Sequence, residues 1–246
     1  MLTEERLNQI TALVKSNGSV RVSELVERLD ASEATIRRDL NTLDKAGKIL
    51  KVRGGAVAVN QGYATQDIKV DIRAEQNTEE KEIIAKFASS LIHDHDFVYL
   101  DAGTTTGRMI DFLTAKDVSF VTNAAEHAKK LSSKGYVTYI LGGEFKADTE
   151  ATVGTEAIEG VSNYNFTKGF FGTNGVTLKN GFTTPDAKEA ALKREAMRNC
   201  KERYVLADRT KLGAISSVKF CSFPNATVLT DSVPEEFKKY RNVKQV

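Results

Sequence analysis

Two adjacent arginines stand inside the stretch SEATIRRDLNTLDK, residues 32–45, and could make specific contacts with a nucleic acid. A helix advances by about 100° per residue, so this one would put its isoleucine and leucines on one face. Arg38, Asn41 and Lys45 then form a row on the opposite face, with Arg37 on its flank. In the major groove of DNA, arginine pairs with guanine edges and asparagine with adenine edges. The spacing therefore predicts a helix that reads double-stranded DNA; the alternative is a plain solvated face.

Residues on either side of this helix could hold the DNA backbone. Ser32 and Thr35 lie in its first turn, where hydroxyls and free N–H groups can meet phosphates. Lys51, Arg53 and Gly54 belong to an expected β-hairpin that could approach the minor groove or the backbone. From the first of the two arginines to Arg53 there are six basic side chains and two acidic ones, although the whole chain has a net charge of +2. A local basic patch on a nearly neutral protein favours a polyanionic partner.

The stretch FVYLDAGTTTGRM, residues 97–109, could bind an anion or a sugar. An apolar strand ends at Asp101 and a loop of small residues leads into a helix; in open α/β sheets, ligands bind where the strands end. Gly103 lets the backbone approach a ligand closely. The N–H groups and hydroxyls of Thr104, Thr105 and Thr106 suit a phosphate, and the aspartate suits sugar hydroxyls. The alternative is a strand-to-helix turn capped by threonines, and the GxxxxGK[ST] pattern of a P-loop is absent.

Other expected strand ends also carry small or polar residues. If these ends converge at one edge of the sheet, they would form a polar pocket of the size of a sugar. Any one of these strand ends alone is usually only a turn. The lysine among them, Lys211, is a candidate phosphate partner, although a lysine at such a position is more often simply exposed to solvent. The further candidate effector-binding residues are Asn123, Gly172, Asn174, Gly175, Asp208 and Lys211.

The sequence offers no strong pattern for catalysis or for a metal site. His93 and His95 stand at an expected helix end, where histidine suits the helix dipole, and no further histidines cluster with them. The GxSxG and HExxH patterns are absent, and Glu189 is the carboxylate that could be offered as a base. Cys200 and Cys221 lack a CxxC spacing. We therefore expect no enzyme activity, no cofactor and no metal.

Composition and charge place the chain among globular proteins of the cytoplasm. Hydrophobic residues make up 41% and charged residues 28% of the chain, which are globular values. No apolar run approaches the roughly 18–20 residues that span a bilayer, and the acidic start MLTEERLNQI is unlike a signal peptide. We expect no membrane partner.

The helix with the two arginines belongs to an expected winged helix-turn-helix DNA-binding domain over residues 1–58. A first helix, a short strand at 20–22 and a second helix capped by Ser23 precede it. Ser32 caps this third helix, and alternating β-formers around Gly54-Gly55 predict the hairpin that would form the wing.

Residues 59–77 show no strong period and are expected to be a linker, which could include a short helix at 69–76. Residues 78–246 are expected to form an α/β domain with a largely parallel sheet, because short apolar runs alternate with helical patterns. Its first helix would bury a face made of Ile83, Ile84, Phe87 and Leu91. The expected strands are 97–100, 119–122, 137–141, 166–172, 204–207 and 227–229, and further helices are expected at 104–114, 124–133 and 186–200.

Taken in order, these motifs resemble the DeoR family of bacterial transcriptional regulators. SEATIRRDLNTL followed by KVRGGA resembles the helix-turn-helix of that family. The resemblance implies an effector domain related in fold to ribose-5-phosphate isomerase and the coenzyme A transferases, phosphorylated sugars as effectors, and oligomers as the DNA-binding form. Within the family, the chain is most similar to the fructose-type regulators. The motifs that resemble the sugar-sensing domain are DAGTTT, TN at 122–123, GG at 142–143, FFGTNG at 170–175 and ADRTK at 207–211.

Two places depart from these relatives. Lys51 and Arg53 stand where the family commonly has arginine and histidine before Gly-Gly-Ala, so the contact made by the wing could differ. The isomerases carry paired acidic residues near the place where this chain has Gly172-Thr173-Asn174-Gly175. This departure weakens an enzymatic function.

We therefore expect a transcriptional repressor of a carbohydrate uptake or catabolic operon. Its partners would be operator double-stranded DNA and a sugar-phosphate effector, with fructose 1-phosphate as the first candidate. A homodimer or homotetramer is expected, because one short recognition helix gains affinity from a paired half-site. The alternatives are an enzyme of the sugar-phosphate isomerase type joined to a DNA-binding head, and a transcriptional activator of the same architecture.

Overall fold

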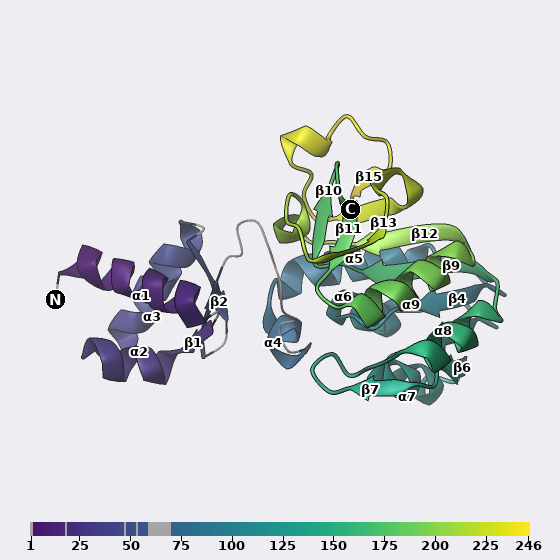
Figure 1. Ribbon diagram of the computed structural model, residues 1–246, viewed down its shortest axis with the longest axis horizontal. Helices are drawn as coiled ribbons and strands as arrows, with labels where there is room; N and C mark the ends of the chain where they lie inside the picture. The colour runs from purple at the N-terminus through teal and green to yellow at the C-terminus, as the bar shows by residue number, and fades with distance from the viewer. Residues whose placement is uncertain (1, 18, 47, 53, 59–69) are drawn as a thin grey trace. The chain divides into compact units, whose positions relative to one another are not determined.

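The computed structural model describes residues 2–17, 19–46, 48–52, 54–58 and 70–246. They fall into two compact units, Met1–Gln61 and Gly62–Val246 (Figure 1). Each unit has hydrophobic clusters of its own. The helix α4 (Val70–Glu75) lies within the segment expected to be a linker and belongs to the second unit.

The N-terminal unit is a winged helix-turn-helix, as predicted. Its three helices surround an apolar core that includes Ile10, Leu25 and Leu40, all fully buried. A three-stranded antiparallel sheet follows the order β1-β3-β2, and the hairpin β2–β3 forms the wing. The elements are α1 (Thr3–Asn17), β1 (Ser19–Arg21), α2 (Val22–Leu29), α3 (Glu33–Lys45), β2 (Ile49–Val52) and β3 (Gly55–Ala58).

Hydrogen bonds fasten the wing to the helices of this unit. The Val22 N–H donates to the Gly54 carbonyl at 2.8 Å, which joins the start of α2 to the hairpin turn. The Lys51 N–H donates to Asp44 Oδ1 at 2.8 Å, which joins β2 to α3. Helix α3 and the wing are therefore held in one arrangement.

The two helix caps predicted in this unit have different outcomes. Ser32 is the N-cap of α3 and accepts a hydrogen bond from the Thr35 N–H at 3.3 Å, which confirms the prediction. The predicted Ser23 cap is wrong, because α2 begins at Val22 with Arg21 as its N-cap. Val22 is buried and its N–H is bonded to the wing, so β1 passes directly into the helix and Ser23 lies inside the first turn.

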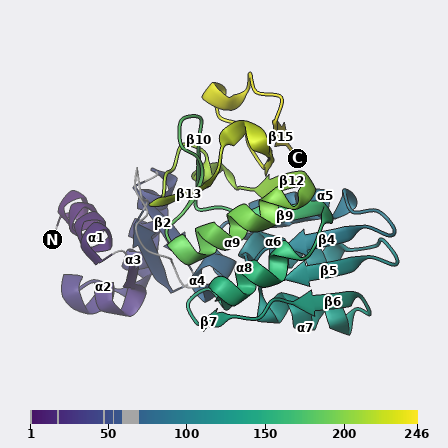
Figure 2. The same ribbon diagram turned by 45° about the vertical axis from the view of Figure 1, so that its right-hand side comes forward.

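The C-terminal unit is an α/β domain, as predicted, and it is built on a seven-stranded parallel sheet (Figures 1 and 2). Its strand order is β15-β14-β12-β9-β4-β5-β6, and every neighbouring pair is parallel. The expected strands coincide with six of these seven strands to within a few residues. The strands are β4 (Phe97–Leu100), β5 (Ser119–Thr122), β6 (Val137–Ile140), β9 (Phe166–Gly172), β12 (Cys200–Leu206), β14 (Thr227–Thr230) and β15 (Val243–Gln245).

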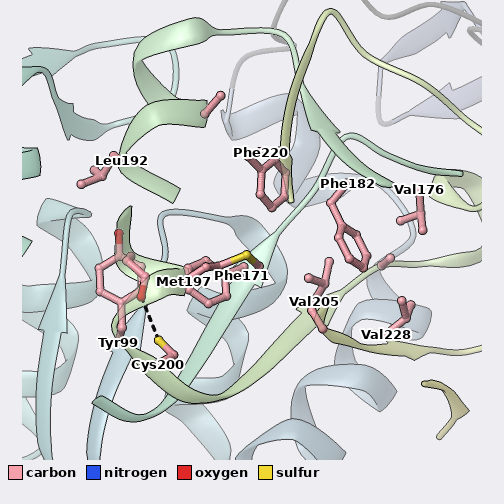
Figure 3. Packing of buried hydrophobic residues seen from close by; sticks show 14 of the residues in the cluster. Tyr99, Phe171, Val176, Phe182, Leu192, Met197, Cys200, Val205, Phe220 and Val228 are labelled. Atoms are coloured by element: carbon pink, nitrogen blue, oxygen red, sulfur yellow. Dashed lines mark hydrogen bonds between the residues drawn. The ribbon is translucent and has the colours of Figure 1, made fainter. Parts of the chain in front are cut away.

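Alternate side chains of the central strands serve two hydrophobic cores, one on each face of the sheet. On β4, Val98 and Leu100 pack in one core and Tyr99 packs in the other. Phe170 and Phe171 divide in the same way on β9, and Figure 3 shows Tyr99 and Phe171 together in the second core. Helices α5 (Thr78–Ser90), α6 (Thr104–Met109) and α7 (Ala125–Ser133) contribute to the first core, and α8 (Thr155–Ser162) and α9 (Ala187–Arg198) to the second.

Two of these helices differ from their predictions. Helix α6 ends at Met109 and continues only as a 3₁₀ turn, so the helix expected over 104–114 is shorter than predicted. On α5, Ile83 and Phe87 are 50% and 36% exposed, whereas Ala85 and Ala88 are buried. The predicted buried face of α5 is therefore wrong in part. The buried face of α5 includes these alanines, because their small side chains allow the helix to pack closely on the sheet.

Smaller elements extend the C-terminal ends of the parallel strands. Strands β10 (Gly175–Thr177), β11 (Gly181–Thr184) and β13 (Val218–Cys221) form an antiparallel sheet. Strands β7 (Glu144–Lys146) and β8 (Ala151–Val153) form a hairpin, and η2 (Arg209–Lys211) is a 3₁₀ turn. Within the described ranges, no helix has the length and apolar character needed to cross a bilayer.

Candidate functional site

The exposed face of α3 carries the predicted row of polar side chains. Arg37, Arg38 and Asn41 are all exposed, and the Ile36 side chain on the opposite face is fully buried. Arg37 is bonded to Glu33 Oε1 through Nη2 at 2.6 Å, a surface pair one helical turn apart. Among the described residues, none forms a hydrogen bond with the Arg38 guanidinium. Arg38 is therefore the arginine of the pair that could meet a base without breaking a hydrogen bond to any described residue.

Other predicted DNA-binding residues lie beside this row. Lys51 Nζ donates to Asn41 Oδ1 at 2.6 Å, so the wing orients the asparagine amide. The Ser32 and Thr35 hydroxyl oxygens are 2.9 Å apart at the first turn of α3. Gly54 adopts φ +84, a left-handed conformation that favours glycine at the tip of the wing. The Lys45 side chain and all of Arg53 lie outside the described residues.

A polar hollow opens at the carboxyl ends of β4, β9 and β12, three neighbouring strands of the sheet. This is the edge at which the predicted residues were expected to converge. The predicted residues that line the hollow are Gly103, Thr104, Thr105, Gly172, Asn174, Asp208 and Lys211. Other polar residues that line it are Arg73, Gln76, Asn77, Lys81, Thr173, Glu189 and Lys193.

Four of the predicted effector residues lie behind this lining, and three of them shape it. Asn123 is buried, with Oδ1 accepting from the Ala102 N–H at 3.0 Å and Nδ2 donating to the Thr152 carbonyl at 3.1 Å. Thr106 donates its hydroxyl to the Asp101 carbonyl at 2.7 Å. Gly175 lies in β10, where a Cβ would collide with the Ala214 carbonyl. Asp101, the fourth, is buried beneath the loop. These groups are engaged by protein atoms and set the course of the backbone around the hollow.

The Asp101 carboxylate forms a buried ion pair with the Lys193 ammonium. Asp101 is 1% exposed and Lys193 is 5% exposed. The same oxygen, Asp101 Oδ2, accepts the Gly172 N–H at 2.9 Å, so one atom joins the ends of β4 and β9 to α9. Burial raises the pKa of the Asp101 carboxyl, and the neighbouring ammonium opposes that rise. We expected the Asp101 carboxylate to contact sugar hydroxyls, but it is bonded to Lys193 and Gly172 within the protein instead.

A cluster of cations occupies the opposite side of the hollow. Burial lowers the pKa of Lys81 to about 8; Asp208 opposes the change, and Lys211, Arg73 and Arg108 add to it. The Lys81 ammonium donates to the Arg73 carbonyl. Burial acts to raise the pKa of Asp208, but Lys211 and the Thr210 hydrogen bonds outweigh it, so the pKa lies below its usual value. A site with several cations around one carboxylate is suited to a multiply charged anion.

Lys81 and Lys193 were not predicted, although each interrupts an apolar stripe. Lys81 shares the buried face of α5 with Ile84 and Ala88. Lys193 shares the buried face of α9 with Ala190 and Met197. A lysine at helical spacing within a buried face must find a partner or a ligand, because isolated buried charges are costly. The helical spacing of these lysines within apolar faces was the sequence feature from which both could have been predicted as site residues.

Carboxylates at the hollow are tied to basic groups. Glu189 Oε1 lies 3.1 Å from Lys146 Nζ, and its N–H is bonded to Asp186, which caps α9. Among the described residues, no group of three or more His, Cys, Asp or Glu side chains is placed to hold a metal ion. The arrangement can bind a polar anion through N–H, ammonium and amide donors.

Comparisons with known proteins assign both units. The model of the DeoR-like helix-turn-helix domain matches residues 6–62, and the model of the DeoR C terminal sensor domain matches residues 76–232. The "uncharacterized HTH-type transcriptional regulator FruR" of Bacillus subtilis (strain 168) is 41% identical over 236 residues, covering 96% of this chain and 93% of that protein. The "lactose phosphotransferase system repressor" of Staphylococcus epidermidis (strain ATCC 12228 / FDA PCI 1200) is 35% identical over 240 residues, covering 96% of this chain and 94% of that protein.

Solved structures resemble the chain more distantly. Ribose 5-phosphate isomerase A from Methanocaldococcus jannaschii is 18% identical, with a TM-score of 0.41 over 56% of this chain and 55% of that chain. A likeness of this size carries no argument about activity.

The buried pair predicts a large effect of removing one partner. Lys193→Met should destabilise the C-terminal unit by about 3–5 kcal/mol, because it leaves the Asp101 carboxylate buried without its counter-charge. The double variant Asp101→Asn with Lys193→Met should recover much of that loss. Urea unfolding of the full chain measures both. Lys188→Met, on the exposed side of the same helix, is the control and should change stability little. Wild-type stability in Lys193→Met would contradict the buried pair.

Proposed function

Because this chain belongs to the DeoR family of transcriptional regulators, we propose that it represses an operon for carbohydrate uptake or catabolism. Its operator binding would be modulated by a phosphorylated sugar. A regulator that binds chromosomal DNA acts in the cytoplasm, which we propose as its location. The observation that carries the proposal is the presence, in one chain, of an exposed row of Arg37, Arg38 and Asn41 on α3 and of a polar hollow lined by cations in the second unit.

The chemistry of the hollow supports a sugar phosphate as the ligand. Lys81 and Lys211 provide positive charge for a phosphate, and the first-turn N–H groups at Thr104 and Thr105 are further donors. Asn174 and Glu189 offer amide and carboxylate groups for hydroxyls. Fructose 1-phosphate is our first candidate, on the basis of similarity to fructose-type regulators.

The ligand would act by binding two states of the protein with different affinities. A coupling free energy of about 1–3 kcal/mol between the two sites would change operator affinity about 5- to 150-fold. We propose that the ligand-bound state fits the operator less well, so that the sugar phosphate relieves repression.

Operator binding followed by fluorescence anisotropy tests this function. DNA from upstream of the operon that carries the gene is titrated with protein at fixed salt, and a panel of sugar phosphates is then added, fructose 1-phosphate first. Specific binding that one sugar phosphate reverses is the expected result. A reporter in a deletion strain separates repression from activation, and the same panel is checked for turnover, which an isomerase would show. Failure to bind this DNA specifically would contradict the regulator function.

Arg38→Ala should weaken operator binding by about 1–3 kcal/mol, because a good base contact is lost. Sugar-phosphate affinity, measured by calorimetry, should be unchanged, since Arg38 lies in the other unit. Arg198→Ala, an exposed arginine of the C-terminal unit, is the control and should keep full operator affinity. Unchanged operator binding in Arg38→Ala would mean that α3 does not read the DNA as proposed.

Lys81 predicts a pH dependence of ligand affinity. Its pKa of about 8 makes it mostly charged at pH 7 and mostly neutral at pH 9. A phosphate dianion favours the charged form, so affinity should fall by about tenfold between pH 7 and pH 9 if only that form binds. Lys81→Met should bind weakly at both pH values, whereas Lys86→Met, exposed on the same helix, should keep the wild-type fall. An affinity that is flat over this range in the wild type would exclude Lys81 as a phosphate ligand.

We propose that the protein is a homodimer or homotetramer, and that β6 lies at a subunit contact. This edge strand of the sheet exposes Val137, Tyr139 and Ile140 by 55%, 45% and 52%, and Phe145 on β7 is 55% exposed. Natural edge strands are usually protected by charges. β6 has none, whereas the opposite edge strand, β15, carries Lys244.

Tyr139→Lys should lower the mass measured by light scattering and weaken operator binding, because a charge is introduced into an apolar contact. Leu178→Lys, another exposed apolar residue, is the control and should leave the mass unchanged. An unchanged mass in Tyr139→Lys would place the contact elsewhere, and the exposed Ile83 and Phe87 on α5 would be tested next.

A further inference from the structure

Helix α4 is held to the C-terminal unit by polar contacts more than by apolar burial. It is six residues long and none of them is buried, and so short a helix is marginal on its own. The Val70 N–H donates to the Asp148 carbonyl at 2.9 Å, and Arg108 Nη2 donates to the Ala74 carbonyl at 2.9 Å. Lys81 Nζ donates a hydrogen bond to the Arg73 carbonyl. An element with few buried apolar contacts belongs to the low-stability part of a fold.

Two buried donors at this helix lack an acceptor within the part of the chain that the structure describes. Arg73 Nε and Gln76 Nε2 are both buried and have no hydrogen-bond partner among the described residues. Gln76 is only 6% exposed. Native proteins leave few buried polar atoms unpaired, and each such atom calls for an explanation. Both side chains line the same hollow as Thr104 and Lys211, so the acceptor they need would be located there.

The charges around these donors indicate what the acceptor is. Arg73, Lys81 and Lys211 line the hollow together with the Asp208 carboxylate. Burial is the main cause of the lowered pKa of Lys81, and the positive charges of Lys211 and Arg73 lower it further. A neutral acceptor would satisfy the hydrogen bonds and leave the charge uncompensated. A phosphate dianion satisfies both, since it offers several acceptor oxygens and two negative charges.

We infer that the phosphate of the ligand accepts hydrogen bonds from Arg73 and Gln76, and that it thereby fixes α4 against the C-terminal unit. This inference rests on the proposed function, and it adds the ligand contacts and the element that responds to them. In the sequence, α4 comes directly after residues 59–69, which follow the wing. A ligand that orders α4 would fix the residues from which the chain continues back to the DNA-binding unit. Coupling by the ordering of one element needs no contact between ligand and head.

Hydrogen exchange of the full chain, read by mass spectrometry, tests the inference. The probes are the sugar-phosphate panel, with fructose 1-phosphate first, and inorganic phosphate in parallel. Backbone amides of 70–77 should exchange more slowly with the sugar phosphate that binds. If opening of α4 requires release of the ligand, exchange should slow by about 100-fold at a ligand concentration 100 times the Kd. Slowing by inorganic phosphate as well would show that the phosphate group alone is enough.

Two variants separate binding from ordering. Arg73→Ala should weaken sugar-phosphate affinity about 10- to 100-fold, because a charge-assisted hydrogen bond is lost. Gln76→Ala should weaken it less. In both variants, saturation with the ligand should still slow amide exchange at 102–106. It should no longer slow exchange at 70–77. Arg241→Ala, an exposed arginine of the same unit, is the matched control and should behave as the wild type.

The outcomes distinguish this inference from the function on which it rests. If a sugar phosphate binds and protects 102–106 while exchange at 70–77 is unchanged in the wild type, the inference is wrong and the proposed function stands. If no member of the panel binds, the proposed ligand class fails and the inference fails with it. The wild-type exchange measurement decides between these outcomes even if a variant does not fold.

Discussion

The buried ion pair between Asp101 and Lys193 is the constraint on which the hollow depends. One carboxylate oxygen receives both the lysine ammonium and the Gly172 N–H, and so ties the ends of β4 and β9 to α9. Neither charge could stay in this interior alone, because desolvation of an unpaired ion costs several kcal/mol. The backbone of the same aspartate accepts the Thr106 hydroxyl. The threonine loop and α9 are thus positioned with respect to each other by the protein itself.

The two sides of the hollow differ in how they are built. On the side of α9, the helix is held by a buried ion pair and by an apolar core to which it contributes. On the side of α4, polar contacts hold a short helix, and two buried donors have no partner within the described part of the chain. One side is preorganised, and in our inference the other is completed by the ligand that it binds. This is the contrast expected of a sensor, in which ligand free energy has to be converted into a change of order.

Hydrophobic periodicity predicted most of the fold. Apolar runs located the strands whose ends form the hollow, and the three-residue and four-residue spacing of Ile36, Leu40 and Leu43 located the recognition helix. The site was predicted less completely. Lys193 meets Asp101 across 92 positions of sequence, a pairing that no local pattern reveals. Residues 73 and 76 lie in a segment without a strong period, whose polar side chains look solvated until the fold places them at the sheet edge. Asn123 was predicted as a polar residue at a strand end and Thr106 as a residue at a helix N-terminus, both to bind the effector, but their hydrogen bonds within the protein follow only from three-dimensional geometry.

The wing and the recognition helix share hydrogen bonds. Lys51 contacts Asn41 through its side chain and Asp44 through its backbone, while Gly54 holds the start of α2. The surface that we propose contacts bases is therefore held as one unit by the protein itself. Under the proposed function, a sugar phosphate that alters repression would have to act on the distance or rotation between two such heads across an operator. The preference for bases within each half-site would then be a fixed property of the head, the same with and without the sugar phosphate.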